Sequence, residues 1–187
     1  MGPIITVDSA PGLILATGNE GEHLEEAKSD TFVSVDGGVK FKKILSGSHV
    51  YQIGDQGSLI VAAKDDKAVT EISFSWNSGE SWKEMEISEK PLFITNIVSD
   101  PANKGLRFLV YGVPQGDTYG FVIPINFEKL MPRDCKHESL GNKGESDYEE
   151  WIPQTLTNKC LNGEQLAYLR RKPHAECFNP DELVMVR

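Results

Sequence analysis

Short apolar stretches separated by polar connectors run through the N-terminal two thirds of the chain. Three stretches consist largely of aliphatic and aromatic residues: 13–18, 59–63 and 108–112. Each is followed by a polar connector and a second stretch rich in β-branched and aromatic residues: 30–34, 71–75 and 119–125. Short runs bounded by Gly, Asp and Asn are typical of β-strands and turns. No window before residue 130 has the apolar spacing of an amphipathic helix, so the pattern predicts an all-β fold.

A short motif, Ser-x-Asp/Asn-x-Gly-x-x-aromatic, occurs twice, 41 positions apart (75 − 34), and each copy follows a strand-like stretch. We expect the Asp or Asn to accept backbone N–H groups and the Gly to supply a positive φ. The aromatic residue should then return to the apolar side of its own unit. Such turns, called Asp boxes, occur on β-propeller blades as structural elements. The structural residues of the two predicted Asp boxes are Ser34, Asp36, Gly38, Phe41, Ser75, Asn77, Gly79 and Trp82.

The repeat predicts a partial β-propeller, because one period of this size corresponds to one supersecondary unit. The third pair of strand-like stretches, 108–112 and 119–125, lacks an Asp box, which is typical of a terminal and divergent repeat. We therefore expect about three blades.

Composition and charge exclude several function classes. The chain has 187 residues, 39% of them hydrophobic and 25% charged, as in an ordinary soluble globular protein. A net charge of −9 argues against a nucleic-acid partner, since affinity for phosphates depends on clustered Lys and Arg. The sequence shows no apolar run of bilayer length and no recognisable signal peptide.

The character of the chain changes near residue 130. A polar stretch, 136–146, is followed by a tail with too little apolar content for a core of its own. Segments of this kind need a disulfide or a neighbouring domain to become ordered.

Three cysteines, Cys135, Cys160 and Cys177, all lie in the last third of the chain and leave three interpretations open. They could be reduced thiols, as expected for a cytosolic protein. They could belong to a disulfide module of which part is missing, because the count is odd. They could bind zinc through Cys135-x-His137 and His174-x-x-Cys177, although no Cys-x-x-Cys pair supports such a site.

The tail resembles the start of the cysteine-rich module of sortilin-family sorting receptors, which include the vacuolar protein sorting receptors of fungi. The strings that carry this resemblance are Cys160-Leu-x-Gly163 and Tyr168-Leu-Arg-Arg-Lys-Pro-His-Ala-Glu-Cys-Phe-Asn179. Upstream, the chain is similar to late propeller blades of the same family. The matching strings there are Ser9-x-Pro11-Gly12-Leu13-Ile14, Thr17-Gly18-Asn19-x-Gly21, Asp30-Thr31-Phe32-x-Ser34-x-Asp36-Gly37-Gly38, His49-x-Tyr51, Gly54-Asp55-x-Gly57 and Ser88-Glu89-Lys90-Pro91.

The resemblance implies a ten-bladed propeller, a ten-cysteine module, one membrane span and a short cytosolic tail that binds sorting adaptors. Residues 1–131 would be the C-terminal blades of the propeller, and residues 132–187 the start of the module. The chain would therefore be a fragment. By position, Cys135 would pair with Cys177 and Cys160 with a cysteine beyond Arg187. A disulfide that closes a loop of about 40 residues stabilises the folded protein by roughly 3–4 kcal/mol.

The family implies a lumenal domain that binds protein or propeptide cargo in the Golgi and endosomes, with no enzymatic activity and no cofactor. Cargo peptides can add to exposed strand edges of a propeller. No cargo-contacting residue is assigned. One alternative is an Asp-box glycosidase of the sialidase type, but only Arg107 and Arg133 lie in or beside the β region, and no nucleophile–base pair is evident. A secreted adhesive propeller is a second alternative.

Two further features have a functional and a structural interpretation. The basic cluster Arg170, Arg171 and Lys172 could attract acidic cargo, or could complement acidic neighbours or the adjacent propeller. His49 and His174 are candidates for a pH switch, although an isolated His is more often an ordinary surface or turn residue. Because three blades leave open edges, we expect the chain on its own to be poorly soluble or to form oligomers.

Overall fold

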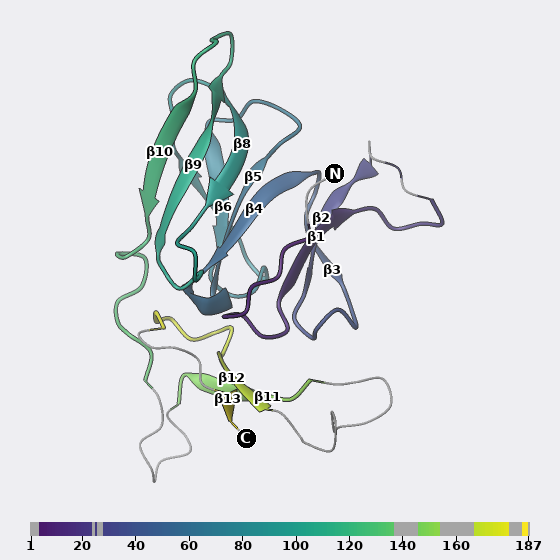
Figure 1. Cartoon of the computed structure of the whole chain (residues 1–187), viewed down its shortest axis with the longest axis vertical. Helices are drawn as coiled ribbons and strands as arrows, with labels where there is room; N and C mark the ends of the chain where they lie inside the picture. The colour runs from purple at the N-terminus through teal and green to yellow at the C-terminus, as the bar shows by residue number, and fades with distance from the viewer. Residues whose placement is uncertain are drawn as a thin grey trace.

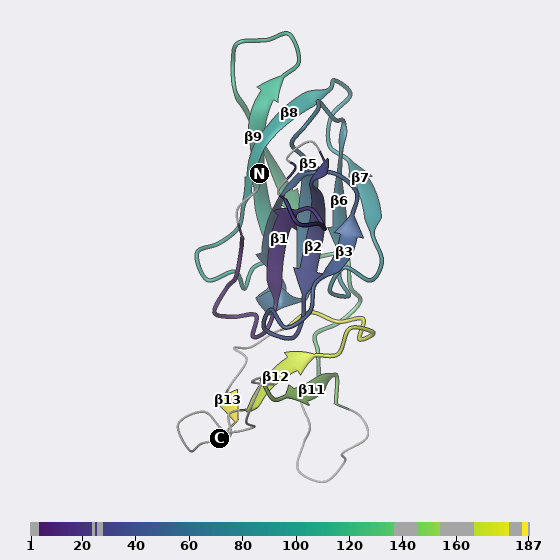
Figure 2. The same ribbon diagram turned by 90° about the vertical axis from the view of Figure 1, so that its right-hand side faces the viewer.

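The computed structural model describes residues 4–23, 25, 28–136, 146–153, 167–179 and 185–186. The strands form four separate antiparallel sheets (Figures 1 and 2). This confirms the predicted fold class, an all-β structure of propeller-like blades followed by a small disulfide-containing segment.

Three of the sheets are the blades, and they follow one another in chain order. The first blade consists of β1 (Ile14–Gly18), β2 (Asp30–Ser34) and β3 (Lys42–Leu45). The second consists of β4 (His49–Gly54), β5 (Leu59–Lys64), β6 (Glu71–Ser75) and β7 (Lys83–Glu86). A short 3₁₀ turn, η2 (Asp55–Gly57), joins β4 to β5. The third consists of β8 (Leu92–Val98), β9 (Arg107–Pro114) and β10 (Phe121–Asn126).

The apolar pattern predicted six strands, and all six are present as β1, β2, β5, β6, β9 and β10. The pattern did not reveal the other four strands of the blades, β3, β4, β7 and β8. Of these, β3 and β7 are only four residues long and carry charged side chains. Each of these two is the last strand of its blade and, in the part of the chain that the structure describes, pairs with a neighbour on one side only. Edge strands are commonly short and charged, and this hides them from an analysis of apolar periodicity.

The middle strand of the second blade joins two hydrophobic cores. In β5, Leu59, Val61 and Ala63 pack in the core shared with the third blade. Ile60 and Ala62 point the opposite way, into the core shared with the first blade. Alternate side chains of a strand lie on opposite faces of a sheet, so a continuous apolar run fits a strand that is covered on both sides.

The outer face of the third blade has no neighbour among the described residues. Phe93, Leu109 and Val122 lie on the three strands of this blade and are 46%, 45% and 63% exposed. Their opposite face packs against the second blade through residues such as Phe108 and Val110. The third blade therefore presents a second apolar face to solvent.

The C-terminal segment (residues 132–187) lies below the blades in Figure 1. Its sheet consists of β11 (Tyr148–Trp151), β12 (Ala167–Arg171) and β13 (Met185–Val186). Its small core contains Cys135, Tyr148, Ala175 and Cys177. Of the residues that the structure describes, none belongs to a helix that is long and apolar enough to cross a membrane.

Candidate functional site

The two Asp-box motifs fold into turns with the same hydrogen bonds. In the first, the Ser34 hydroxyl donates to Asp36 Oδ1 at 2.8 Å and accepts the N–H of Gly38 at 2.9 Å. The Asp36 carboxylate also accepts the N–H of Lys40 at 3.0 Å. This last bond is the main reason why the pKa of Asp36 is below its usual value.

The second turn replaces Asp by Asn and keeps the same geometry. The Ser75 hydroxyl donates to Asn77 Oδ1 at 3.0 Å and accepts the N–H of Gly79 at 2.9 Å. Asn77 Oδ1 accepts the N–H of Ser81 at 2.9 Å, as the carboxylate does in the first turn. The amide also donates to the Ser81 hydroxyl at 2.9 Å, which a carboxylate cannot do.

The aromatic residues of the two turns differ. Trp82 packs against the core between the first and second blades, and its indole N–H donates to the carbonyl of Gly79 at 3.2 Å. Phe41 is 48% exposed. This differs from the expectation that both aromatic residues return to the apolar side of their own unit. Phe41 instead lines a cavity between the first two blades and the C-terminal segment.

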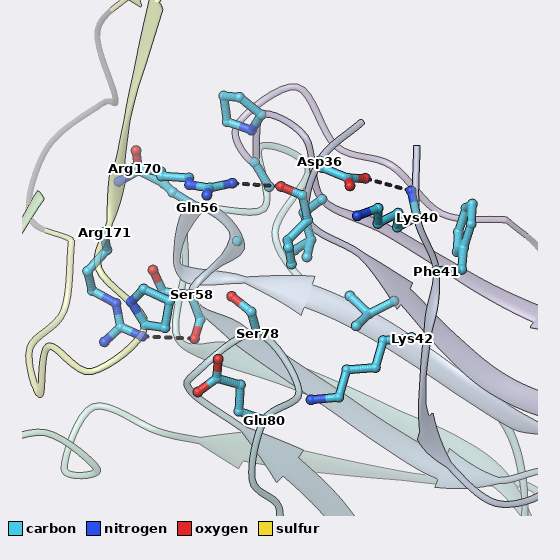
Figure 3. A pocket seen from close by; sticks show the side chains of 17 residues that line it. Asp36, Lys40, Phe41, Lys42, Gln56, Ser58, Ser78, Glu80, Arg170 and Arg171 are labelled. Atoms are coloured by element: carbon cyan, nitrogen blue, oxygen red, sulfur yellow. Dashed lines mark hydrogen bonds between the residues drawn. The ribbon is translucent and has the colours of Figure 1, made fainter. Parts of the chain in front are cut away.

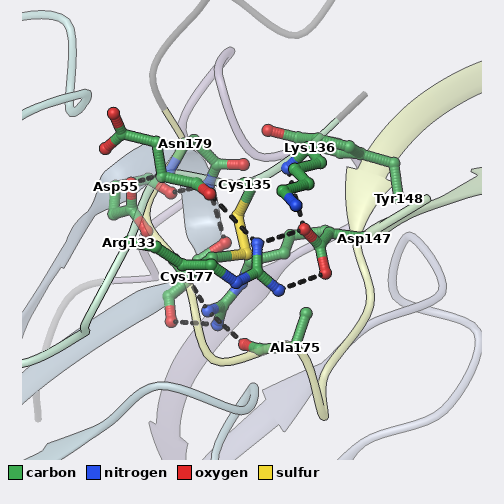
Figure 4. The surroundings of a disulfide bond; sticks show 12 residues. Asp55, Arg133, Cys135, Lys136, Asp147, Tyr148, Ala175, Cys177 and Asn179 are labelled. Atoms are coloured by element: carbon green, nitrogen blue, oxygen red, sulfur yellow. Dashed lines mark hydrogen bonds and ion pairs between the residues drawn. A yellow bond between two sulfur atoms is a disulfide. The ribbon is translucent and has the colours of Figure 1, made fainter. Parts of the chain in front are cut away.

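The C-terminal segment is closed by a disulfide between Cys135 and Cys177, which are 42 residues apart (Figure 4). Backbone hydrogen bonds flank the bridge, from Cys135 N–H to the Phe178 carbonyl and from Phe178 N–H to the Arg133 carbonyl. The two sulfur atoms and the Asp147 carboxylate lie within 4.8 Å of one another. Because both sulfurs are in the disulfide, neither is available as a thiolate, and the zinc hypothesis does not hold for this pair.

An ion pair braces the same region. The Arg133 guanidinium donates two hydrogen bonds to the Asp147 carboxylate, at 2.5 and 2.9 Å. The N–H of Lys136 also donates to this carboxylate, at 2.8 Å. These hydrogen bonds lower the pKa of Asp147 to about 2, and those from Arg133 have the largest effect. Asp147 therefore remains ionised down to strongly acidic pH.

Arg171 of β12 connects the C-terminal segment to the second blade. Its guanidinium donates within the segment to the carbonyls of Ala175 and Cys177, at 2.7 and 2.8 Å. It also donates to the carbonyl of Ser58 at 3.2 Å and to that of Trp76, both in the second blade. Arg171 is 7% exposed, and this burial lowers its pKa. One side chain thus crosslinks segments that are far apart in the sequence.

Asn179 and Asp55 form a second link between the segment and the same blade. The Asp55 carboxylate accepts the backbone N–H of Asn179 at 2.9 Å, while the Asn179 amide donates to the Asp55 carbonyl at 2.8 Å. Burial raises the pKa of Asp55 to about 7, although the Asn179 bonds and the charge of Arg171 lower it. Sequence analysis assigned no role to either residue. The visible signal was the string Gly54-Asp55-x-Gly57 at the end of an apolar strand.

A tryptophan and an arginine hold the segment against the first blade. A Cβ added at Gly12 would lie 2.8 Å from the Trp151 ring, so the blade allows close approach only because glycine is there. Arg170 lies over the same ring and donates to the carbonyl of Val35 at 2.7 Å. It also pairs with Glu149 at 2.7 Å.

All three residues of the basic cluster therefore make contacts within the chain itself. Arg170 and Arg171 contact the blades as described above, and the Lys172 ammonium donates to the Ser146 carbonyl at 2.7 Å. These contacts confirm the interpretation in which the cluster complements acidic neighbours and the adjacent propeller.

The two histidine candidates lie in different surroundings. His49 is buried between the first two blades, where Nδ1 lies 3.0 Å from the Gly47 carbonyl and 3.0 Å from the Thr31 hydroxyl. Burial lowers the pKa of His49, because it disfavours the charged imidazolium. His174 is exposed. Cys160 and His137 lie outside the described residues, so the structure does not place either of them.

The cavity next to Phe41 has a volume of about 420 Å³ (Figure 3). Both Asp-box turns, the η2 turn and β12 contribute to its lining. Its walls combine apolar side chains with four lysines and arginines and two acidic residues, Asp36 and Glu80, in a chain whose net charge is −9. The sequence could not reveal this cavity, because its lining comes from five separate stretches of the chain.

Comparison with known proteins agrees with this arrangement. Residues 1–97 match a family profile described as "Sortilin, neurotensin receptor 3", and residues 99–186 match the C-terminal profile of the same description. The chain is 34% identical to the sortilin-related receptors of rabbit (Oryctolagus cuniculus) and human (Homo sapiens) over 96% of its length, which is 8% of theirs. It is 36% identical to the vacuolar protein sorting/targeting protein 10 of Penicillium rubens over 91% of its length, which is 11% of that protein. The chain thus spans only a small part of these relatives, and it belongs to the sortilin/Vps10 family of sorting receptors.

Proposed function

We propose that this chain is part of the lumenal cargo-binding domain of a transmembrane sorting receptor, which carries proteins such as hydrolases from the Golgi to endosomes and the vacuole or lysosome. The observation that carries the proposal is the continuous similarity to such receptors, across the blades and the C-terminal segment alike. Its partners would be protein or propeptide cargo on the lumenal side. Sorting adaptors would bind a cytosolic tail elsewhere in the protein.

The contacts of the chain favour binding over catalysis. A sialidase needs arginines that are free to grip the substrate carboxylate. Arg107 is paired with Glu128 at 2.7 Å, and Arg133 with Asp147. The Asp-box carboxylate of Asp36 is likewise occupied by its own turn. Rigid blades with exposed strand edges are suited to holding a protein or peptide.

We also propose that residues 1–131 form the last blades of the propeller and residues 132–187 the start of the cysteine-rich module. Phe127 and Leu130 still pack in the core of the third blade, which supports a boundary after them. The two family profiles meet earlier, between residues 97 and 99. A cut at that point would separate β8 from β9, which are paired along almost their whole length.

A chimeric receptor tests the function. The segment of a fungal Vps10 receptor that matches this chain would be replaced by residues 4–186, and vacuolar hydrolase in the medium would be measured. We expect the chimera to retain hydrolase in cells that lack their own receptor. A matched chimera with Cys135→Ala and Cys177→Ala should lose retention. Secretion of hydrolase despite normal amounts of the correctly located first chimera would contradict the proposal and favour an adhesive role.

A further inference from the structure

The cavity at the junction of the two Asp-box turns and the C-terminal segment has the dimensions of a ligand site. Its volume of about 420 Å³ is within the range of pockets that accept small molecules or side chains. Figure 3 shows Phe41 and Lys42 on one side, Arg170 and Arg171 on the opposite side, and Ser78 and Glu80 from the second Asp-box turn.

The apolar side chains that line the cavity include two that are buried in the core and two that are partly exposed to solvent. Leu13 and Val33 are buried and belong to the core between the first two blades. Val35 and Phe41 are 41% and 48% exposed and form the outer part of the wall. Exposed apolar side chains at the rim of a cavity can contact an apolar group of a ligand.

Four basic residues and two acidic ones, Asp36 and Glu80, line the cavity, and this excess of positive charge favours an anionic partner. Lys42 is exposed, and it has no ion pair or hydrogen bond of its side chain to any described residue. The exposed Lys42 ammonium would gain from pairing with a carboxylate of a ligand.

A strand edge adjoins the cavity. Lys42 is the first residue of β3, which pairs with β2 on one side and, among the described residues, has no strand on its other side. The backbone groups along that side can accept an extended peptide as an additional strand. Side chains of such a peptide would alternate between the two faces of the sheet.

We propose that this cavity binds an extended peptide segment of a protein partner, in which a large apolar side chain stands next to acidic ones. The apolar side chain enters between Val35 and Phe41, a carboxylate pairs with Lys42, and the backbone aligns along β3. This inference rests on the proposed function, because it names a place on the receptor where protein cargo is held.

Peptide binding to the full chain with its disulfide intact tests the inference. The probes are fluorescein-labelled decapeptides, blocked at both ends, with a central Leu or Phe flanked by Glu, and binding is measured by fluorescence anisotropy. Three comparison peptides carry Lys for Glu, Ser for the apolar residue, or N-methylated backbone positions. We expect each change to weaken binding about tenfold or more, since each removes one component of recognition.

Matched variants locate the site. Lys42→Glu should weaken binding at least about tenfold, whereas Lys67→Glu makes the same charge change at an exposed position between β5 and β6 and should have no effect. Phe41→Ser should weaken binding by a similar factor, and Phe93→Ser on the third blade should not. All four positions are exposed, so the fold should persist, and melting curves verify this.

Photocrosslinking and cargo capture separate the possible failures. A benzophenone at the apolar position of the peptide should crosslink to the region of Val35 and Phe41. Crosslinks to the third blade, or equal binding by Lys42→Glu and the original chain, would overturn the inference. In the chimeric receptor, hydrolase retention that Lys42→Glu leaves intact would also overturn it and leave the proposed function standing. Loss of retention already in the unmodified chimera would count against the proposed function itself.

Discussion

The Asp55 carboxylate of the second blade accepts the backbone N–H of Asn179 at 2.9 Å, 124 residues further along the chain. The Asn179 amide returns a hydrogen bond of 2.8 Å to the Asp55 carbonyl. This pair and the neighbouring Arg171 join the C-terminal segment to the blades. Because Asp55 is 2% exposed, its protonation state is coupled to the stability of the whole junction.

Asp55→Asn should remove part of the pH dependence of stability. The pKa of Asp55 is about 7 in the folded protein and near its ordinary value of 3.8 in the unfolded chain. Between these two values the folded state binds more protons than the unfolded chain does. The contribution of Asp55 to stability is therefore complete below pH 4 and is lost as the pH rises through about 7. Asn keeps an oxygen acceptor for Asn179 and has no charge to bury.

The measurement is the free energy of unfolding in urea between pH 5 and 7.5. The original chain should lose stability relative to Asp55→Asn across this range, by about 1.4 kcal/mol for each pKa unit involved. Asp36→Asn is the control: the pKa of Asp36 is lowered, so its contribution is lost only as the pH falls below about 4. Parallel curves for Asp55→Asn and the original chain would contradict the assigned pKa.

Arg171→Met should destabilise the junction by about 3 kcal/mol, because four buried carbonyl groups lose a charged donor. Arg107→Met is the matched control. Its partner Glu128 is half-exposed, and such a surface pair is worth no more than about 1 kcal/mol. Urea unfolding gives the free energies, and limited proteolysis should cut the C-terminal segment first in Arg171→Met. Equal losses in the two variants would mean that Arg171 has no special role.

Removing the disulfide by Cys135→Ala and Cys177→Ala should lower the free energy of unfolding by about 4 kcal/mol, since the bridge closes a loop of 42 residues. Thiol alkylation of the unreduced, unfolded chain provides the check on pairing. We expect Cys160 alone to react, because its predicted partner lies beyond this sequence. Alkylation of Cys135 or Cys177 without a reductant would contradict the pairing.

Gly79→Ala should cost more than Gly116→Ala, although both residues have a similar positive φ, 81° and 87°. The backbone penalty is about 1 kcal/mol in each case. At Gly79 the new methyl group would also lie 2.9 Å from Ile44 of the first blade, whereas at Gly116 it would meet nothing within 4 Å. We expect a difference of about 1–2 kcal/mol in the free energy of unfolding. Combining Gly79→Ala with Ile44→Ala should remove the extra strain.

The chain by itself should self-associate through the exposed face of the third blade. Phe93, Leu109 and Val122 lie on this face, and an apolar surface that extends over three strands favours association. Light scattering with size-exclusion chromatography should show concentration-dependent oligomers. Leu109→Lys with Val122→Lys should shift the chain toward the monomer, while the same kind of change at exposed apolar positions of the first blade, Val35→Lys with Val39→Lys, should not. A stable monomer of the original chain at high concentration would contradict this prediction.

The sequence alone determined those features that depend on local chemistry. A strand that is buried on both faces, such as β5, must be a continuous apolar run, and the run is visible without a structure. The Asp-box turns are equally local, because Ser75, Asn77 and Gly79 bond with one another within five residues. The edge strands β3 and β7 remained hidden, since a short strand with charged side chains has no apolar signal.

Only the tertiary structure decided how the C-terminal segment meets the blades. Nothing local distinguishes Arg171 from its basic neighbours, yet it is the one of the three that is buried, because the carbonyls of Ser58 and Trp76 lie opposite it. The position of Phe41 likewise depends on where the segment and the second blade leave a cavity. Local sequence fixes a strand or a turn through bonds between near neighbours. A junction depends on groups more than 90 residues apart, which only the folded chain brings together.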